Sequence, residues 1–575
     1  MKRLIKTVCT FLLVLSTGLT GLSLYGCSNR RGGGEVIDTS RTQIYVAVFN
    51  GGYGSEWLQN AKVRFEETFK DKSYESGKKG AQIIITPYLD RSICSTSLYN
   101  NIDLNPNEMF FTETIPYQEF VAGGKFLDIT EAVTTPLTEF GEEKSIEDKM
   151  FPYHIENFKT DGKYYALPYY EAFHGIIYDV DMFEDELFYF ALDQDNGNDG
   201  FIFDLEDERS YGPDGRTGVI DGVDYSADDG LPATYEEFYR LCDRMKEQGI
   251  DPITWSGGNP SEVTKTMSAL HADYEGADQM MLNLTFDGTA TGLVDTVDEN
   301  GNITLQDPLE ITEENGYMLQ RQAGKYYALD FFDTIIEREY YADLTFNTSQ
   351  SNTGAQEEYL YSKFSSSKTP IAMLVDGSYW ENEASGIFTD MVNGGYGQAA
   401  AKENRRFALM PYPKATQEKL EEQTSPVFMD INYSTALVSS RIEEFKIPLA
   451  LDLLRFLHTD KELCEYTVTT NTPKPYQYDL GEEYLSRMTY YGRSLYELHS
   501  SGNIIYPSSN SPVFYRNFNN LTPEFRPWVS TIGTSTYNVP ITGLRASGVD
   551  AKDYFDGLMN ARGETYWRNN ILVNL

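Results

Sequence analysis

The stretch QIYVAVFNGGYGSEWLQNAKVRFEETF, residues 43–69, constrains the fold more than any other part of the chain. It begins with an apolar run, turns at the glycine-rich NGGYG, and continues with Trp57, Leu58, Ala61 and Phe65 at helical spacing. A second β-branched run follows at 83–85. Because a helix is the usual connection between two parallel strands, the sequence predicts a strand–helix–strand unit and an α/β fold.

The same alternation continues along the chain. The segments EMFFTET, GIIYDV and PIAMLV predict further strands. The segment LPATYEEFYRLCDRMKEQG predicts a helix that begins with a capping box of Thr234 and Glu237 and ends at Gly249. Two polar stretches, 191–232 and 286–325, are rich in Asp, Gly, Asn and Thr, and we interpret them as insertions. The sequence shows no internal repeat.

The N-terminus has the layout of a secretory signal peptide. Three cations in the first six residues precede an apolar stretch at 8–24, which runs into LYGC with Cys27. The stretch is shorter than the roughly 20 residues of a membrane span. LYGC resembles the bacterial lipobox, which implies removal of residues 1–26, acylation of Cys27, as by palmitate, and a flexible tether over 27–40. We therefore expect a protein that is anchored by lipid alone on the extracellular face of the cell membrane. An ordinary signal peptide with an incidental cysteine is the alternative.

Composition and missing motifs disfavour several classes of function. The formal net charge of −40 argues against a nucleic-acid partner, because phosphate backbones are bound through Lys- and Arg-rich surfaces. Beyond the N-terminus only Cys94, Cys242 and Cys464 remain, which indicates no disulfide framework and no zinc site. The motifs G-x-S-x-G, H-E-x-x-H and G-x-x-x-x-G-K-[ST] are missing. A glycoside hydrolase stays open, because two carboxylates suffice for that chemistry.

Five segments in order resemble the extracellular solute-binding proteins of carbohydrate ABC importers, in the family 1, maltose-binding-protein-like branch. They are GGYGSEW, DGKYYALP followed by GIIYDVDMF, LPATYEEF, PIAMLVDGSYW followed by NE, and ALDLLRFLHTDKE. The resemblance covers about residues 42–475. It implies two α/β lobes joined by hinge strands, with the ligand in the cleft between them. It also implies two membrane permeases and a cytoplasmic ATPase as partners. The length of the chain and its two insertions depart from the family.

The resemblance implies a division of the chain into lobes. The expected boundaries are 41–166 and 428–480 for lobe 1, 167–427 with the two insertions for lobe 2, and 481–575 for a helix-rich C-terminal part whose lobe stays open. Hinges are expected at 166–170 and 428–433, and the protein is expected to be a monomer.

Aromatic residues make up 14% of the chain, and their rings suit the apolar faces of sugars. Tyr53 and Trp57 follow the first strand, at the end of a strand where α/β sheets bind ligands. Other candidates lie at strand ends or, by the resemblance, at the lobe crossing and in the cleft: Tyr169, Tyr170, Glu171, Trp255, Asp376 and Trp380, with Glu113 and Asp430 as polar partners. For each candidate, packing in the core or a place on the surface is the competing interpretation.

Residues 195–206, DNGNDGFIFDLE, partly match a calcium-binding loop. Asp195, Asp199 and Glu206 are the candidate ligands of a structural calcium ion, whereas Gly197 occupies another ligand position. A solvated acidic loop is the alternative, and no other cofactor is expected.

The expected ligand is an extracellular oligosaccharide, and the chain is not expected to be an enzyme. An oligopeptide-binding protein of an ABC importer would share the architecture, and a surface adhesin would share the anchor. A peptide binder should offer paired ionic groups to the charged termini of its ligand, and an adhesin should show repeats.

Overall fold

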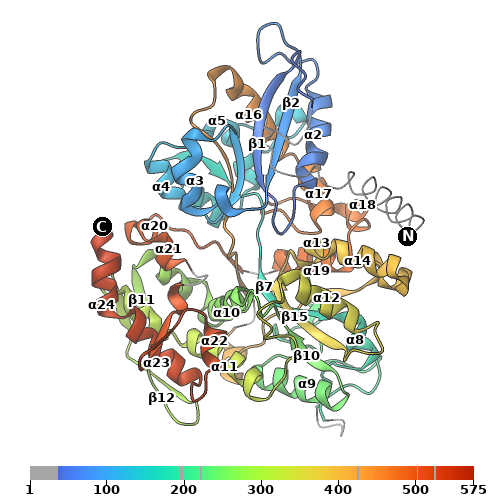
Figure 1. Cartoon of the computed structure of the whole chain (residues 1–575), viewed down its shortest axis with the longest axis vertical. Helices are drawn as coiled ribbons and strands as arrows, with labels where there is room; N and C mark the ends of the chain where they lie inside the picture. The colour runs from blue at the N-terminus through green and yellow to red at the C-terminus, as the bar shows by residue number, and fades with distance from the viewer. Residues whose placement is uncertain (1–35, 195–198, 221–222, 424–425, 502, 523–525) are drawn as a thin grey trace, which may run out of the picture.

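The computed structural model describes residues 36–194, 199–220, 223–423, 426–501, 503–522 and 526–575. Two lobes, each with its own central sheet, lie one above the other and are joined by extended segments (Figure 1). The predicted signal peptide and Cys27 lie outside the described residues. Within those residues, no helix combines the length and the apolar character that a membrane crossing needs.

Lobe 1 contains the predicted strand–helix–strand unit. β1 (Thr42–Phe49) pairs in parallel with β2 (Ala81–Tyr88) on one side and with β3 (Met109–Glu113) on the other. α2 (Glu56–Thr68) connects β1 to β2 and buries the apolar face that the helical spacing predicts. The unit and the α/β class are therefore confirmed.

Lobe 2 contains a four-stranded mixed sheet in the order β10–β15–β7–β16. β10 (Asp251–Thr254) is parallel to β15 (Ile371–Gly377), and β7 (His174–Asp179) runs antiparallel to β15 and to β16 (Phe407–Leu409). Every residue of β7 and β15 is buried, which explains their nearly continuous apolar sequences.

Long helices cover the lobe 2 sheet. The N-cap of α9 (Tyr235–Glu247) is Thr234, whose hydroxyl accepts the backbone N–H of Glu237 at 3.3 Å. In a capping box the Glu237 carboxylate would accept the backbone N–H of Thr234 in return. It instead accepts the backbone N–H of Ala233, the residue before Thr234. α10 (Ser261–Thr285), which is kinked at Gly276, and α11 (Ala323–Glu337) pack against each other.

The chain crosses between the lobes through short extended segments. The first crossing, residues 168–173, joins β6 (Ala166–Leu167) at the edge of the lobe 1 sheet to β7 of lobe 2. The return crossing leads from β16 through β17 (Val427–Met429) to β18 (Ser434–Val438), which pairs antiparallel with β3 and β6. The Ser434 hydroxyl joins the two crossings, because it donates to the Tyr170 carbonyl and accepts the Tyr170 N–H.

The C-terminal part, whose lobe the sequence leaves open, packs mainly on lobe 2. α19 (Tyr490–Ser501) packs against β16, and α23 (Ala551–Arg562) packs against α11. α20 (Pro512–Arg516) contacts α4 (Tyr117–Ala122) of lobe 1, and α21 (Phe518–Leu521) follows it. This part of the chain therefore contacts both lobes.

The polar stretch 286–325 forms small local sheets. β11 (Gly288–Ala290) pairs with β14 (Leu309–Ile311), and β12 (Val294–Val297) pairs with β13 (Ile303–Leu305) between them. They lie next to the C-terminal helices in Figure 1. In the described part of 191–232, the regular strands are β8 (Val219–Ile220) and β9 (Val223–Asp224).

Candidate functional site: a cavity between the lobes

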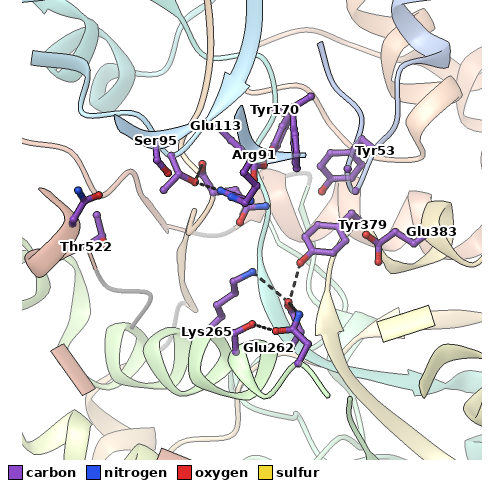
Figure 2. A pocket seen from close by; sticks show the side chains of 18 of the residues that line it. Tyr53, Arg91, Ser95, Glu113, Tyr170, Glu262, Lys265, Tyr379, Glu383 and Thr522 are labelled. Atoms are coloured by element: carbon purple, nitrogen blue, oxygen red, sulfur yellow. Dashed lines mark hydrogen bonds and ion pairs between the residues drawn. The ribbon is translucent and has the colours of Figure 1, made fainter. Parts of the chain in front are cut away.

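A cavity of about 460 Å³ lies between the two lobes, where several strands end. Lobe 1 contributes the loop after β1, the residues after β2 and the end of β3. Lobe 2 contributes the start of α10 and the residues after β15, and the C-terminal part contributes α21. Five aromatic side chains line the cavity: Phe49, Tyr53, Tyr170, Tyr379 and Phe518. Figure 2 shows several of them together with the charged groups of the lining.

Gly52 allows the loop after β1 to approach lobe 2 closely. Its φ of +54° lies in the left-handed region, which side chains with a Cβ disfavour. A Cβ at this position would also lie 3.2 Å from Cγ of Tyr379. The glycine-rich turn that the sequence places after the first strand therefore brings the two sides of the cavity together.

Tyr53 connects the lobe 1 loop to lobe 2. Its hydroxyl lies 2.7 Å from the Ser378 hydroxyl and donates to the Glu171 carbonyl at 3.1 Å. Its ring meets Tyr170 and Tyr379 edge-on, with centroids 5.0 and 6.1 Å apart. Tyr53 thus contacts the first crossing and both walls of the cavity.

The lobe 1 wall carries an ion pair. Arg91 Nη1 donates to Glu113 Oε1 at 2.6 Å, and Arg91 Nη2 donates to the Thr114 hydroxyl at 3.1 Å. The other Glu113 oxygen accepts the Tyr170 hydroxyl. Only 6% of the Glu113 side chain is exposed, compared with 52% of the Arg91 side chain. Arg91 is therefore the more exposed member of this ion pair, and both residues of the pair line the cavity.

The lobe 2 wall is centred on the Glu262 carboxylate. The Tyr379 hydroxyl donates to Glu262 Oε2 at 3.1 Å, the Asn259 amide donates to Oε1 at 3.1 Å, and Lys265 Nζ lies 3.4 Å from Oε1. His174 Nδ1 lies 3.1 Å from Oε2. Burial by itself would raise the pKa of Glu262, but Lys265 and His174 hold that pKa well below its ordinary value.

Two further carboxyls lie beside Glu262. The Gln356 amide donates to Asp376 at 2.9 Å and to Glu383 at 3.1 Å. Burial raises the pKa of both carboxyls, and the charge of Glu262 raises it further. Of the three carboxyls Glu262, Asp376 and Glu383, Glu262 therefore carries most of the negative charge. Its partners are cationic or donate hydrogen bonds to it.

The structure places three of the sequence-predicted residues in the cavity lining: Tyr53, Glu113 and Tyr170. Asp376 is 2% exposed and lies behind the lobe 2 wall. The remaining polar and tyrosine candidates, Tyr169, Glu171 and Asp430, are buried in the crossings between the lobes.

Glu171 and Asp430, which lie in the crossings, each have structural partners. The Glu171 carboxylate lies 2.8 Å from His154 Nε2 and 2.6 Å from His499 Nε2. Asp430 Oδ1 accepts the backbone N–H of Ala172 at 3.2 Å. These contacts fix the connecting segments, and neither carboxyl lines the cavity.

The three tryptophans that the sequence offers as ligand platforms lie in the core instead, which corrects that expectation. Trp57 is 3% exposed, and Trp255 and Trp380 are 0% exposed. Their partners are aromatic: Phe111, Tyr169 and Tyr466 for Trp57, Phe332, Tyr341 and Phe346 for Trp255, and Tyr359, Phe388, Phe407 and Tyr491 for Trp380. A ring that is covered on all sides offers no face to a sugar.

Several lining residues are missing from the sequence-based prediction: Arg91, Glu262, Lys265, Tyr379, Glu383 and Phe518. Tyr379 immediately precedes Trp380, so the segment DGSYW reaches the cavity lining through Tyr379 and not through Trp380. Glu262 and Lys265 follow the ITW strand end, where the start of a helix could have indicated them. Nothing in the local sequence around Phe518 indicates that the C-terminal part reaches the cavity.

The predicted calcium loop is only partly described. Asp195 lies outside the described residues, and the described Asp199 and Glu206 are exposed. Within the described ranges, no group of three or more His, Cys, Asp or Glu side chains is placed to hold a metal ion. The calcium site stays a prediction.

Comparison with known proteins shows a likeness in fold. No protein-family model matches the chain, and no curated protein sequence matches it. Among solved structures, the chain is similar to a chitin oligosaccharide binding protein, with a TM-score of 0.50 and 13% sequence identity. The match covers 89% of this chain and 95% of the other. At this identity the likeness shows the fold, and it supports the predicted α/β architecture with two lobes.

Proposed function

We propose that this protein binds an extracellular oligosaccharide in the cavity between its lobes and delivers it to the permease of an ABC importer. The observation that carries the proposal is the cavity itself. It lies at strand ends from both lobes, and it combines five aromatic side chains with charged and amide groups. Aromatic faces suit the C–H faces of sugar rings, and the polar groups suit their hydroxyls.

The size and position of the cavity fit a binding protein. Its volume of about 460 Å³ falls within the range of roughly 300 to 1,000 Å³ that is common for small-molecule sites. The first crossing and the return crossing both border it, through Tyr170 and Asn432. A ligand there touches both lobes, so its binding favours an arrangement in which the lobes are close together. The solved structure with a similar fold is described as binding chitin oligosaccharides, which agrees with a saccharide ligand.

A peptide ligand is the second candidate, and one observation favours it. The candidate residues that the sequence places near the cleft are mostly aromatic or acidic. The cavity in the structure also contains two basic residues, Arg91 and Lys265. Together with Glu113 and Glu262 they supply charges of both signs, which the two termini of a peptide could use.

Calorimetry and thermal-shift measurements over oligosaccharides and short peptides test the proposal. A saccharide at 100 times its dissociation constant should add about 2.7 kcal/mol to the free energy of unfolding. Phe518→Ala should weaken that binding, because Phe518 lines the cavity, whereas Phe445→Ala, at an exposed position on lobe 1, is the matched control. Binding of peptides without any binding of saccharides would contradict the proposal.

Two further measurements test the remaining parts of the proposal. Chromatography after prolonged incubation with a bound saccharide should show no shorter products, and their appearance would make the protein a glycoside hydrolase. Uptake of a labelled saccharide by cells with and without the protein tests delivery to an importer. Equal uptake in both would contradict that role.

A further inference from the structure

One wall of the cavity comes from a part of the chain that lies beyond the resemblance to solute-binding proteins. Phe518 and Asn519 of α21, with Thr522 after it, line the cavity, whereas the resemblance ends at about residue 475. In Figure 2 Thr522 lies on one side of the cavity and Glu383 on the other. The three side chains of this wall are uncharged, and they offer an aromatic ring, an amide and a hydroxyl. This wall therefore suits an uncharged sugar ring.

Phe518 packs against the return crossing between the lobes. It is 7% exposed, and its ring meets Tyr433 of that crossing edge-on, with centroids 5.7 Å apart. It also contacts Phe514 of α20, with centroids 5.9 Å apart. α20 in turn packs against α4 of lobe 1 and α10 of lobe 2. Residues 512–521, which form α20 and α21, therefore contact both lobes and a segment that connects them.

Asn517 lies between α20 and α21, and its amide is hydrogen-bonded at both ends. Its Nδ2 donates to the Val513 carbonyl at 2.9 Å and to the Ile571 carbonyl at 3.2 Å. Its Oδ1 accepts the Asn574 amide at 2.6 Å. Because Asn517 is only 2% exposed, water cannot easily replace these bonds. The side chain of Asn517 therefore joins α21 to residues 571–574.

Neighbouring contacts extend this support to lobe 2. The Tyr566 hydroxyl donates to the side chain of Asn520 in α21 at 3.2 Å. Trp567 Nε1 donates at 2.8 Å to the carbonyl of Glu313, which belongs to the second of the two insertions. Residues 566–574 thus contact the insertion of lobe 2 as well as α21. The position of α21 therefore depends on both of these additions to the chain.

We propose that Asn517 is a positioning residue of the ligand site, and that α21 contacts one sugar unit of the ligand through Phe518 and Asn519. This inference rests on the proposed saccharide-binding function and names the part of the chain that completes its site. Asn517 does not line the cavity, so it acts on a ligand through α21. Side chains that are already held in place lose less entropy on binding, so the release of α21 weakens binding.

Calorimetry on the whole protein tests the inference, with short chitin, cellulose and xylan oligosaccharides as probes. With the tightest-binding probe, Asn517→Ala should weaken binding about ten-fold, which corresponds to about 1.4 kcal/mol. Asn574→Ala should also weaken it, and because Asn574 is exposed, this variant should fold even if Asn517→Ala does not. Asn560→Ala is the matched control, because its exposed side chain donates to the Thr531 carbonyl at 3.0 Å and not to α21.

A double-mutant cycle with Phe518→Ala shows whether Asn517 acts through α21. If it does, Asn517→Ala should have much less effect on affinity once the Phe518 ring has been removed. A merely structural role would give additive losses of affinity instead. Hydrogen exchange of the free protein adds a measurement that needs no ligand. Residues 512–522 should exchange faster in Asn517→Ala and in Asn574→Ala than in the wild type.

The outcomes separate this inference from the function on which it rests. Saccharide binding that is unchanged in Asn517→Ala and in Asn574→Ala, or additive losses in the cycle, would overturn the role of Asn517 and leave saccharide binding in place. Unchanged hydrogen exchange of residues 512–522 in both variants would also overturn it. Binding of no saccharide in the panel by the wild type would overturn both proposals.

Discussion

Replacement of Trp380 by alanine should damage the stability of lobe 2 rather than the recognition of a ligand. The indole is fully buried, and it packs edge-on against Phe407 and Tyr491 with ring centroids 5.0 and 5.7 Å apart. Truncation of a buried tryptophan to alanine costs about 3 to 5 kcal/mol, because it removes apolar burial and leaves a cavity. With an unfolding entropy of about 2.1 cal/mol/K per residue, a loss of about 4 kcal/mol lowers the melting temperature of a domain of roughly 300 residues by about 6 °C.

The neighbouring Tyr379 provides the contrast, because its ring lines the cavity and its hydroxyl donates to Glu262. Tyr379→Ala should weaken ligand binding by roughly ten- to a hundred-fold, since loss of a buried aromatic contact costs about 1.5 to 3 kcal/mol. Calorimetric titration at 25 °C and melting curves without ligand should be recorded for both variants. The reasoning is refuted if Trp380→Ala melts like the wild type and loses affinity.

Three further predictions concern the anchor, the hinge and the response to pH. Cys27→Ser should move the protein from the membrane fraction to the soluble fraction, and unchanged retention would contradict lipid anchoring. Small-angle scattering should show a smaller radius of gyration with a bound ligand than without it, as the segments 166–170 and 428–433 bend; an equal radius would argue against closure. Burial would raise the pKa of Glu171, but its hydrogen bonds to His154 and His499 lower that pKa to about 2. Its ionised form therefore stabilises the fold above about pH 4.5, and this contribution is lost as the pH falls towards 2. Urea titrations should show a shallower loss of stability over this interval in Glu171→Gln, and identical slopes would count against this role.

The fold could be predicted because local patterns specify it. The run at 44–48, the glycine turn and the helical spacing after it predict β1 and α2, and the apolar runs GIIYDV and PIAMLV predict β7 and β15. Each of these signals depends on residues that are neighbours in sequence. The lobe on which the C-terminal part packs depends on contacts such as α23 with α11, which no local pattern contains.

The candidate site was predictable only in part, because the sequence shows which residues are aromatic but not which way they point. At the end of β15 the consecutive residues Tyr379 and Trp380 lie in opposite environments, one in the cavity wall and the other in the core. A shift of one position along the chain therefore decides whether a side chain lines the cavity or packs in the core. Arg91 belongs to no motif, and it becomes a candidate only when the fold brings the segment after β2 into contact with Glu113 at the end of β3.

Two residues that line the cavity, Tyr53 and Tyr170, also take part in the hydrogen bonds of the segments that connect the lobes. Tyr170 donates its hydroxyl to Glu113 in the cavity, and its backbone N–H donates to Ser434 in the return crossing. The Tyr53 hydroxyl lies 2.7 Å from the Ser378 hydroxyl, which also accepts the backbone N–H of Phe173 in the first crossing. If a ligand reorganises the contacts of Tyr53 or Tyr170, it therefore also changes hydrogen bonds of the segments that connect the lobes. A ligand shifts the balance of open and closed states only by its difference in affinity for the two. These shared residues are where that difference can arise.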